Sequence, residues 1–501
     1  MYETVVLSLQ HFNSIQNLAF LLMGTLIGLV FGTVPGLGGA TTLALVMPLT
    51  YGMDTTSAMI LAGGLMGSVA MGGSITAVLI NTPGSAPSAA TCLDGYPMTQ
   101  QGRAGVAIGA LASSTSLGAL IGVFSLLAVL PVARKLVMAF GPPEFFLLAV
   151  LGMTAISISA GGKLVRGMMV GTGGVVLSFI GYDAVNGGQR FTFGSEYLSE
   201  GIPLVPAMLG LFAVSEMIDL AVRGGAVAKL GSKTEFAGIW EGVCASFKHW
   251  PVVLRSSLIG TIEGSIPGVG GTAASFLAYS VTVQADNHPE TFGTGRVEGV
   301  IAPEAAINAK EAACLIPTLT FGIPAGIEMA VFLGMLILHG IEPGPMLLLN
   351  HSDTIYALVI ALTLSCLIGA IVGMVCIKPL ALITRIDVHI LVPLILAVSA
   401  AGTYSIHQQP YDVLVTAAFG VFGYLLRRFE YPRLPLVLAL VLGPVAERSF
   451  QQTMMITDGS WRIFFDHTVS EVLMGVIALA IVLPLWRGVQ HRRLATKGGA
   501  A

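Results

Sequence analysis

Charged residues are scarce in this chain. Asp, Glu, Lys and Arg make up 10% of its 501 residues, whereas soluble domains carry about 25%. Hydrophobic residues make up 54%, the mean hydropathy is +0.83 and the formal net charge is -3. So little charge cannot cover the surface of a soluble protein of this length, and we expect an integral membrane protein. The few basic residues are dispersed among loops and give no sign of a nucleic-acid partner.

Several functional motifs are also missing. The five cysteines have no CxxC spacing, so neither a disulfide framework nor a metal site is predicted. The absence of a GxxxxGK[ST] loop argues against an ATP-driven pump. Ser74 follows a glycine as a nucleophile can, but no histidine lies in a matching span, so we predict no catalytic residues and no enzyme. No Lys or Arg precedes the first apolar run, and we interpret that run as a retained span rather than a signal peptide.

Glycine and long apolar runs are abundant instead. The chain has 62 glycines, and runs of the length that a helix needs to cross a bilayer recur along it. These runs do not alternate polar and apolar residues as the strands of a membrane barrel do. The predicted fold class is an all-α integral membrane protein with about 12 transmembrane helices, some of them broken or re-entrant half-helices.

A repeated motif divides the chain into two halves. Residues 34–39 (VPGLGG) and 266–271 (IPGVGG) lie 232 residues apart, and each interrupts an apolar run. Residues 26–28 (LIG) and 203–205 (PLV) recur at the same offset. Duplicated units with matching broken helices are typical of secondary transporters. The predicted division is a first transmembrane repeat over 1–221, a cytoplasmic linker over 222–250, a second repeat over 251–453, and an extra C-terminal helix with a basic cytoplasmic tail over 454–501.

Loop charges predict that the two repeats are inverted. The linker and the tail hold clusters of Lys and Arg, which places both in the cytoplasm by the positive-inside rule. Counting membrane crossings back from the linker and the tail places the loop around Lys163 on the cytoplasmic side. The loop around Ser405, which corresponds to it in the repeat, is placed outside. Arg134 and Lys135 fall on the outside in this scheme and do not follow the rule. The prediction is two repeats of opposite topology.

The breaks carry the predicted substrate site. Proline ends one half-helix, and the glycines that follow leave N–H groups uncovered at the positive end of the next, where an anion can bind. A second break follows in each half, at 81–85 (NTPGS) and 322–326 (GIPAG). A competing interpretation is that these residues only permit kinks and close packing. The predicted substrate-binding residues are Gly36, Gly38, Gly39, Thr41, Asn81, Thr82, Gly84, Ser85, Gly268, Gly270, Gly271, Thr272, Gly322 and Pro324.

In combination, these motifs resemble one known family. Residues 32–39, 72–84, 93–97 and 302–324 are similar to the large membrane subunit of tripartite tricarboxylate transporters, the TctA family. The resemblance covers nearly the whole chain. It implies a permease of the bacterial inner membrane that imports citrate-like di- and tricarboxylates by ion-gradient-driven symport. It also implies a small four-helix membrane subunit (TctB-like) and a periplasmic solute-binding protein (TctC-like). The chain departs from the family's paired asparagines at Ile307-Asn308 and from its Pro-Gly-Ser at residues 324–326.

Charged residues inside apolar runs are the predicted ion-coupling groups, because a buried ionisable residue in a membrane is costly and usually functional. Glu304, Asn308 and Glu311 are spaced four and three apart and so share one helical face. They would bind the coupling ion, a proton or sodium, and no other cofactor is predicted. The alternative is that the acids are structural and pair with Lys310 or another base. Glu263, Glu328 and Asp94 are secondary candidates, and Asp94 is predicted to lie in a turn at 93–97.

Two other transport functions stay open at this stage. A stand-alone sodium/dicarboxylate symporter would work without a binding protein. An anion channel would also use backbone groups at a constriction. Uptake against a gradient distinguishes a carrier from a channel, and transport without the binding protein would favour the stand-alone symporter.

Overall fold

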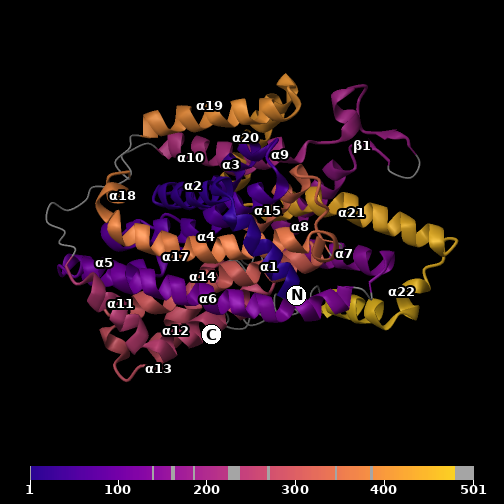
Figure 1. Cartoon of the computed structure of the whole chain (residues 1–501). Helices are drawn as coiled ribbons and strands as arrows, with labels where there is room; N and C mark the ends of the chain where they lie inside the picture. The colour runs from indigo at the N-terminus through magenta and orange to yellow at the C-terminus, as the bar shows by residue number, and fades with distance from the viewer. Residues whose placement is uncertain are drawn as a thin grey trace, which may run out of the picture. The chain divides into compact units, whose positions relative to one another are not determined.

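The protein is helical throughout the part that its computed structural model describes, apart from one short hairpin (Figure 1). The described residues are 2–137, 140–158, 164–183, 187–223, 237–267, 271–344, 347–383 and 388–479. The hairpin pairs β1 (Gly181–Tyr182) with β2 (Gln189–Arg190) in antiparallel register. The predicted all-α class is therefore confirmed.

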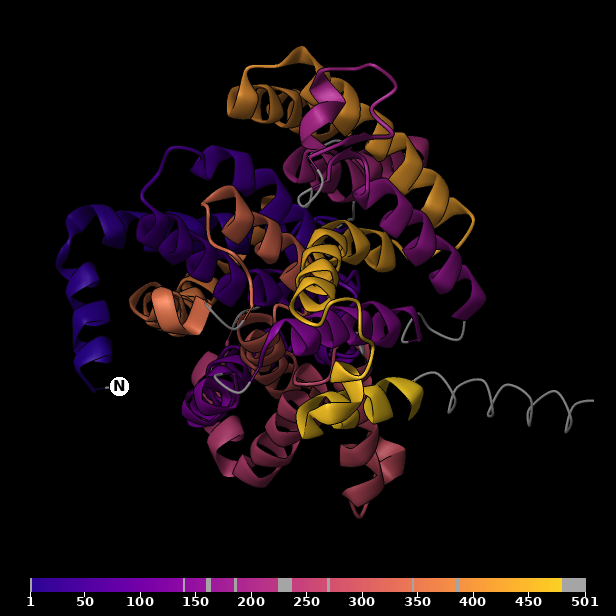
Figure 2. The same ribbon diagram turned by 90° about the vertical axis from the view of Figure 1, so that its right-hand side faces the viewer.

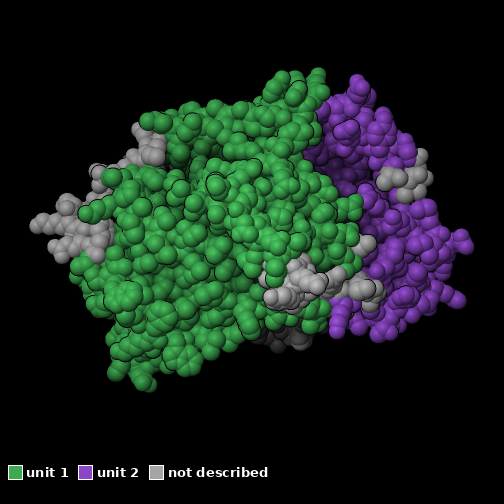
Figure 3. Space-filling model, viewed as in Figure 1, with its two compact units in different colours: residues 1–134, 205–425 green, residues 135–204, 426–501 purple. Residues whose placement is uncertain are grey.

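The chain forms two compact units, coloured separately in Figure 3. Unit 1 comprises residues 1–134 and 205–425, and unit 2 comprises residues 135–204 and 426–501. The helices of unit 1 are α1 (Tyr2–Gln10), η1 (His11–Asn13), α2 (Ile15–Gly32), α3 (Gly39–Val46), η2 (Met47–Thr50), α4 (Thr55–Ile80), η3 (Pro87–Ala89), α5 (Cys92–Gln100), most of α6 (Ala104–Val137), α9 (Leu204–Leu209), the π-helical turn η5 (Gly210–Val214), α10 (Ser215–Arg223), α11 (Ile239–Lys248), α12 (Trp250–Gly264), α13 (Gly271–Ala285), η6 (Pro289–Thr291), α14 (Glu298–Phe321), α15 (Ile327–Leu338), α16 (Leu347–Asn350), α17 (Ser352–Val375), α18 (Ile377–Ile383), α19 (Val388–His407) and most of α20 (Pro410–Arg428). Unit 2 holds α7 (Pro142–Ile158), α8 (Leu164–Ser178), the hairpin, η4 (Tyr197–Glu200), α21 (Leu434–Ile456) and α22 (Ile463–Asp466).

Seven helical stretches in the described residues are long and apolar enough to cross a membrane. They are α2, α4, α6, the continuous stretch Leu204–Val222, α17, α19 and α21. Five further apolar helices are too short to cross alone and include α3 and α15. Short apolar helices next to full-length ones are what broken or re-entrant segments produce.

Helix α4 is buried along almost its entire length, and glycines allow its neighbours to approach it closely. Gly24, Gly28 and Gly32, on one face of α2, pack against the α4 backbone so tightly that a Cβ at any of them would overlap a carbonyl oxygen. On another side, Gly63 and Gly67 of α4 meet the α17 backbone. This is small-residue helix packing as membrane proteins use it, because dispersion contacts replace the hydrophobic effect there.

Helix α14 is packed in the same way in the second half. Gly260 and Gly264 of α12 lie against its backbone on one side, and Gly118 and Gly122 of α6 lie against it on the other. Every residue from Glu298 to Thr320 is buried. Protein therefore surrounds α14 where a membrane span would meet lipid, which explains why it carries several charged residues and is not among the seven apolar spans.

The end of the predicted linker is helical. Helix α11 packs on α6, where the Ser113 hydroxyl donates to Ser246 Oγ at 2.8 Å. Helices α12 and α13 then form a hairpin, seen at the foot of Figures 1 and 2. Residues 224–236 of the predicted linker lie outside the described residues.

Candidate functional site

The predicted break at 34–39 is present between α2 and α3, and its backbone shape comes from one glycine. Gly36 has φ +91°, a conformation that side chains rarely adopt. Gly38 is the N-cap of α3, with φ −62° and ψ 177°, where most residues fit. Helix α3 is eight residues long and largely buried, so its positive end lies inside the protein.

The break at 81–85 lies directly against the first one. Asn81 ends α4 in the left-handed conformation, with φ 54°. The N–H of Gly84 then donates to the carbonyl of Gly73 at 3.1 Å. A Cβ on Gly84 would overlap the carbonyl oxygen of Gly32, the last residue of α2. The two breaks of the first half therefore cross backbone to backbone, and only glycine fits at the crossing.

The break at 322–326 brings a carboxylate from the second half to the same place. Gly322 ends α14 with φ 68°, as Asn81 ends α4, and Glu328 lies in the first turn of α15. The Glu328 carboxylate accepts a hydrogen bond from the backbone of Gly39. A Cβ on Gly39 would be 2.5 Å from its Oε1 atom, so a side chain there would displace the carboxylate. The N-terminus of α3 thus holds a carboxylate in this structure, and that carboxylate belongs to the protein.

Glu328 is partly buried and belongs to a cluster with the buried residues Glu263, Lys310 and Glu311. Lys310 Nζ contacts Glu311 Oε1 at 2.7 Å, and Glu311 is hydrogen-bonded in turn to Glu328. Glu263 of α12 is buried near Lys310, and neither of its carboxylate oxygens has a hydrogen-bond partner in the described residues. One lysine cannot balance three ionised carboxylates at a mostly buried position, so the cluster favours a neutral form of at least one acid.

Glu304 lies in a second, separate cluster. It is completely buried, and its carboxylate accepts hydrogen bonds from Thr91 at 2.5 Å, from Thr115 at 3.2 Å and from Ser74. Asn308 donates to the backbone carbonyl of Glu304 at 3.1 Å instead of to its carboxylate. The predicted coupling residues therefore divide between two clusters, and no group of three or more His, Cys, Asp or Glu in the described residues is arranged to hold a metal ion.

The other predicted substrate residues differ in their positions. Thr41 is buried in α3, and Pro324 is buried in its break. Asn81 is exposed, while Thr82 Oγ1 donates to the carbonyl of Ile80. Gly322 packs against the backbone of Gly344. In the second-half motif, Gly268 and Gly270 lie outside the described residues, Gly271 begins α13, and the side chain of Thr272 is also outside them.

The predicted turn at 93–97 is wrong, because these residues lie within helix α5 despite Pro97. Asp94 is fully buried there and accepts hydrogen bonds from the N–H groups of Gly295 and Arg296, both at 2.8 Å, and from the hydroxyl of Tyr279 at 2.9 Å. The Asp94 side chain thus fixes the start of α14 against α5 and α13, which is a structural role.

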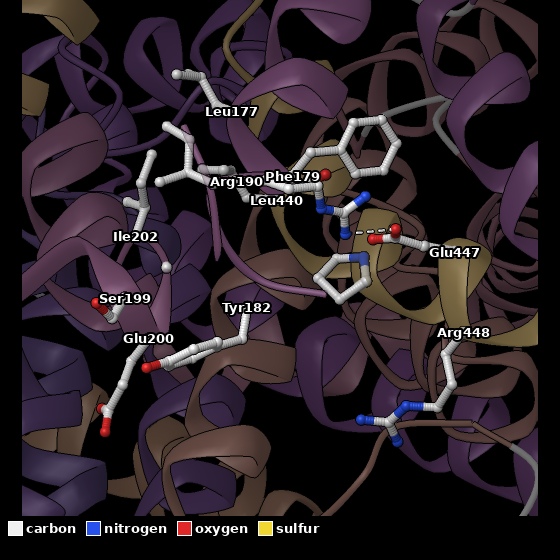
Figure 4. Close-up of a pocket in the computed structure, with 14 residues that line it drawn as sticks. Leu177, Phe179, Tyr182, Arg190, Ser199, Glu200, Ile202, Leu440, Glu447 and Arg448 are labelled. Atoms are coloured by element: carbon white, nitrogen blue, oxygen red, sulfur yellow. Dashed lines mark hydrogen bonds and ion pairs between the residues drawn. The ribbon is translucent and has the colours of Figure 1, made fainter. Parts of the chain in front are cut away.

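Unit 2 contains a cavity of about 230 Å³, and none of the predicted site residues lines it (Figure 4). Arg190 crosses it to pair with Glu447 at 2.6 Å, and its guanidinium lies 5.6 Å from the centre of the Phe179 ring. Tyr182 and Arg448 also line the cavity. With its main charges already paired, this cavity carries no chemistry comparable to that of the buried clusters in unit 1.

Sequence reasoning named most of the glycines and acids at the breaks, but it ranked Glu328 as secondary and did not name Ser88, Thr91 or Thr115 as site residues. The position of Glu328 two residues after a break was the one available signal. Serine and threonine are common in membrane helices, so nothing in the sequence distinguishes those that contact Glu304.

Apolar spans, broken helices and buried charged clusters together define a multi-pass α-helical membrane protein of the secondary-transporter type. The chain belongs to the tripartite tricarboxylate transporter TctA family, whose model matches residues 18–438. That family supplies the membrane transporter subunit of tripartite tricarboxylate transport systems, and its members are not enzymes.

Two curated relatives come from Agrobacterium vitis. One is an uncharacterised 52.8 kDa protein in the TAR-I ttuC' 3' region, 32% identical over 477 residues, which are 95% of each chain. The other is an uncharacterised protein in the TAR-II ttuC' 3' region, 33% identical over 234 residues, which are 47% of this chain and 97% of the relative. No solved structure matches the chain.

Proposed function

We propose that the protein is the large permease subunit of a binding-protein-dependent secondary transporter that imports citrate-like di- and tricarboxylates across the bacterial inner membrane. Import is driven by an ion gradient and proceeds by alternating access. A small four-helix membrane subunit and a periplasmic solute-binding protein complete the system, as the family's tripartite composition suggests.

The Glu328 carboxylate at the N-terminus of α3 is the observation that carries this proposal. Its hydrogen bond from the backbone of Gly39 supports a carboxylate site at this end of α3, since helix N-termini bind anions. Ser85 of the neighbouring break lies beside Gly38, close enough to add a hydroxyl. A substrate carboxylate would replace that of Glu328, and the remaining substrate-binding residues are those predicted at the breaks.

Uptake of radiolabelled citrate by right-side-out membrane vesicles tests this function. The full chain would be expressed with its co-encoded small subunit and binding protein. We expect accumulation against a concentration gradient when a proton or sodium gradient is imposed, and none when the chain is omitted. Equilibration without accumulation would indicate a channel. Undiminished uptake without the binding protein would indicate a stand-alone symporter.

Equivalent contacts in the two halves support the proposal of inverted repeats. Helix α2 packs on α4 as α12 packs on α14, and each of these pairs is followed by a break that begins with a left-handed residue. The next long helix of each half packs against the other half: α6 lies on α14, and α17 lies on α4. We propose that a pseudo-twofold axis in the membrane plane relates the two repeats, as in other inverted repeats. Each repeat then packs its next long helix, α6 or α17, against the opposite repeat.

Cysteines at Val165 and Ser405 should be labelled from opposite sides of the membrane. Val165 is 70% exposed in the first turn of α8, next to Lys163, and Ser405 is exposed in the last turn of α19. Each would be introduced into a chain that lacks the five native cysteines and treated with an impermeant maleimide on intact cells. We expect only Ser405→Cys to react. Labelling of both from the same side would contradict inverted repeats.

We also propose that Glu304, Asn308 and Glu311 couple the driving ion to substrate movement. Glu304→Gln and Glu311→Gln keep side-chain size but remove a titratable group. Each should lower gradient-driven citrate uptake by at least about tenfold while citrate exchange persists. Exchange assays in the same vesicles measure both, and Glu430→Gln, at an exposed ion pair with Arg166, is the control. Unchanged gradient dependence in both variants would exclude the two acids from coupling.

A further inference from the structure

The Glu304 carboxylate is surrounded by hydroxyl groups and lacks a basic partner among the described residues. Its hydrogen-bond donors are Ser74 on α4, Thr91 just before α5 and Thr115 on α6. The groups that hydrogen-bond to the Glu304 carboxylate in the described residues are all hydroxyls. The neighbouring titratable group is the thiol of Cys92. Because an uncompensated charge in a dry interior is very costly, a neutral form of this carboxyl must be accessible during the transport cycle.

A chain of three serines connects this carboxyl to the substrate break. The Ser74 hydroxyl donates to Ser88 Oγ at 3.0 Å, and rotation of its O–H bond lets it donate to the Glu304 carboxylate instead. Ser88 Oγ lies 3.1 Å from Ser85 Oγ, and either hydroxyl can be the donor. Ser74 and Ser88 are completely buried, whereas Ser85 is partly exposed and lies next to Gly38. The chain therefore runs from the accessible break to the buried acid without an interruption.

Hydroxyl groups can pass a proton along such a chain because each has one donor and two acceptor positions. We propose that Ser85, Ser88 and Ser74 relay a proton between the substrate break and Glu304, so that Glu304 is a proton-binding site of the transporter. This inference rests on the proposed function and specifies a proton as its coupling ion.

The transfer leaves the serines unchanged. A hydronium ion at the break gives a proton to Ser85 Oγ and becomes water. Each hydroxyl then passes its own proton onward, from Ser85 to Ser88 to Ser74, and the Glu304 carboxylate becomes a carboxylic acid. Release reverses these steps. One O–H bond forms at Glu304 for each one broken at hydronium, and one positive charge moves inward with the substrate anion.

Ser88→Ala breaks the relay at its middle and should separate proton coupling from substrate movement. In vesicles that contain the full system, we expect citrate uptake driven by a pH gradient to fall by at least about tenfold. Citrate exchange at equal pH should persist, because exchange does not require the proton to leave. Ser114→Ala is the matched control: Ser114 is also fully buried, but it donates only to the carbonyls of Ala110 and Leu111 on its own helix.

A second variant covers the case in which Ser88→Ala does not accumulate in the membrane. Glu304→Gln cannot take up the proton and should exchange citrate at a rate that no longer varies with pH. The relay would be overturned if Ser88→Ala takes up citrate under a pH gradient as fast as the wild type. It would also be overturned if Ser88→Ala, but not Ser114→Ala, loses driven uptake and exchange to the same extent. Citrate uptake by the wild-type protein under a sodium gradient without a pH gradient would overturn the relay as well, but it would leave the proposed function intact. Absence of any citrate exchange in wild type would overturn the proposed function and this inference together.

Discussion

Gly84→Ala is expected to abolish citrate uptake and to destabilise the protein. The added methyl group would overlap the carbonyl oxygen of Gly32 and lie 2.6 Å from Gly73 Cα, and both of these are backbone atoms that cannot rotate away. Overpacking a tight interior costs about 1–3 kcal/mol, and more where backbone must move. Since the two breaks of the first half cross at this point, any shift of Gly32 also moves the start of α3.

Gly38→Ala is the matched control for Gly84→Ala. Gly38 has a negative φ, and the nearest atom to an added Cβ is Ser85 Cβ, at an ordinary 3.7 Å. Because the added methyl group displaces no backbone, we expect this variant to keep the stability of the wild type. Uptake assays combined with thermal unfolding in detergent measure both variants. If Gly84→Ala transports like wild type, the breaks do not meet as closely as the structure describes, and the site must lie elsewhere.

Lys310→Met is expected to cause the second large effect. Lys310 is the one base in the cluster with Glu263, Glu311 and Glu328, and its removal leaves these three acids, two of them buried, without a cation. Removing one member of a buried ion pair costs about 3–5 kcal/mol. The variant should therefore lose gradient-driven uptake and accumulate poorly in the membrane, as measured by citrate accumulation and by the amount of purified protein.

The double variant Lys310→Met, Glu311→Leu tests the cause of that loss. Replacing both members of a buried pair by apolar residues is often neutral for stability. We therefore expect the protein level to recover, while gradient-driven uptake stays low because Glu311 is missing. If the double variant is no more stable than Lys310→Met, the 2.7 Å pair does not account for the stability of α14.

Gly38 and Gly39 show which features of the site the sequence could predict and which it could not. Both were predicted to bind substrate through uncovered backbone, from a motif in which they are equivalent. In the structure, a side chain at Gly39 would displace the Glu328 carboxylate that packs on it, whereas Gly38 has room for a side chain. The difference depends on a residue almost 290 positions away, and no local pattern contains it.

The acids of α14 show the same limit. Helical spacing placed Glu304, Asn308 and Glu311 on one face, which is correct as a statement about the helix. The partners of the two acids include residues of α4, α6 and α15 and Thr91 before α5, however, so the structure assigns Glu304 to a hydroxyl cluster and Glu311 to a charged one.

The sequence by itself determined the class of the protein, because hydropathy and the scarcity of charge depend only on composition and run length. It also located the breaks at 34–39, 81–85 and 322–326, since proline and glycine act on their own backbone, although Pro97 lies within a helix. Only the tertiary structure decided which breaks meet, which carboxylate occupies the end of α3, and which serines connect Glu304 to the substrate break. These are contacts between segments far apart in the chain, and glycine packing between helices, rather than any local preference, fixes them.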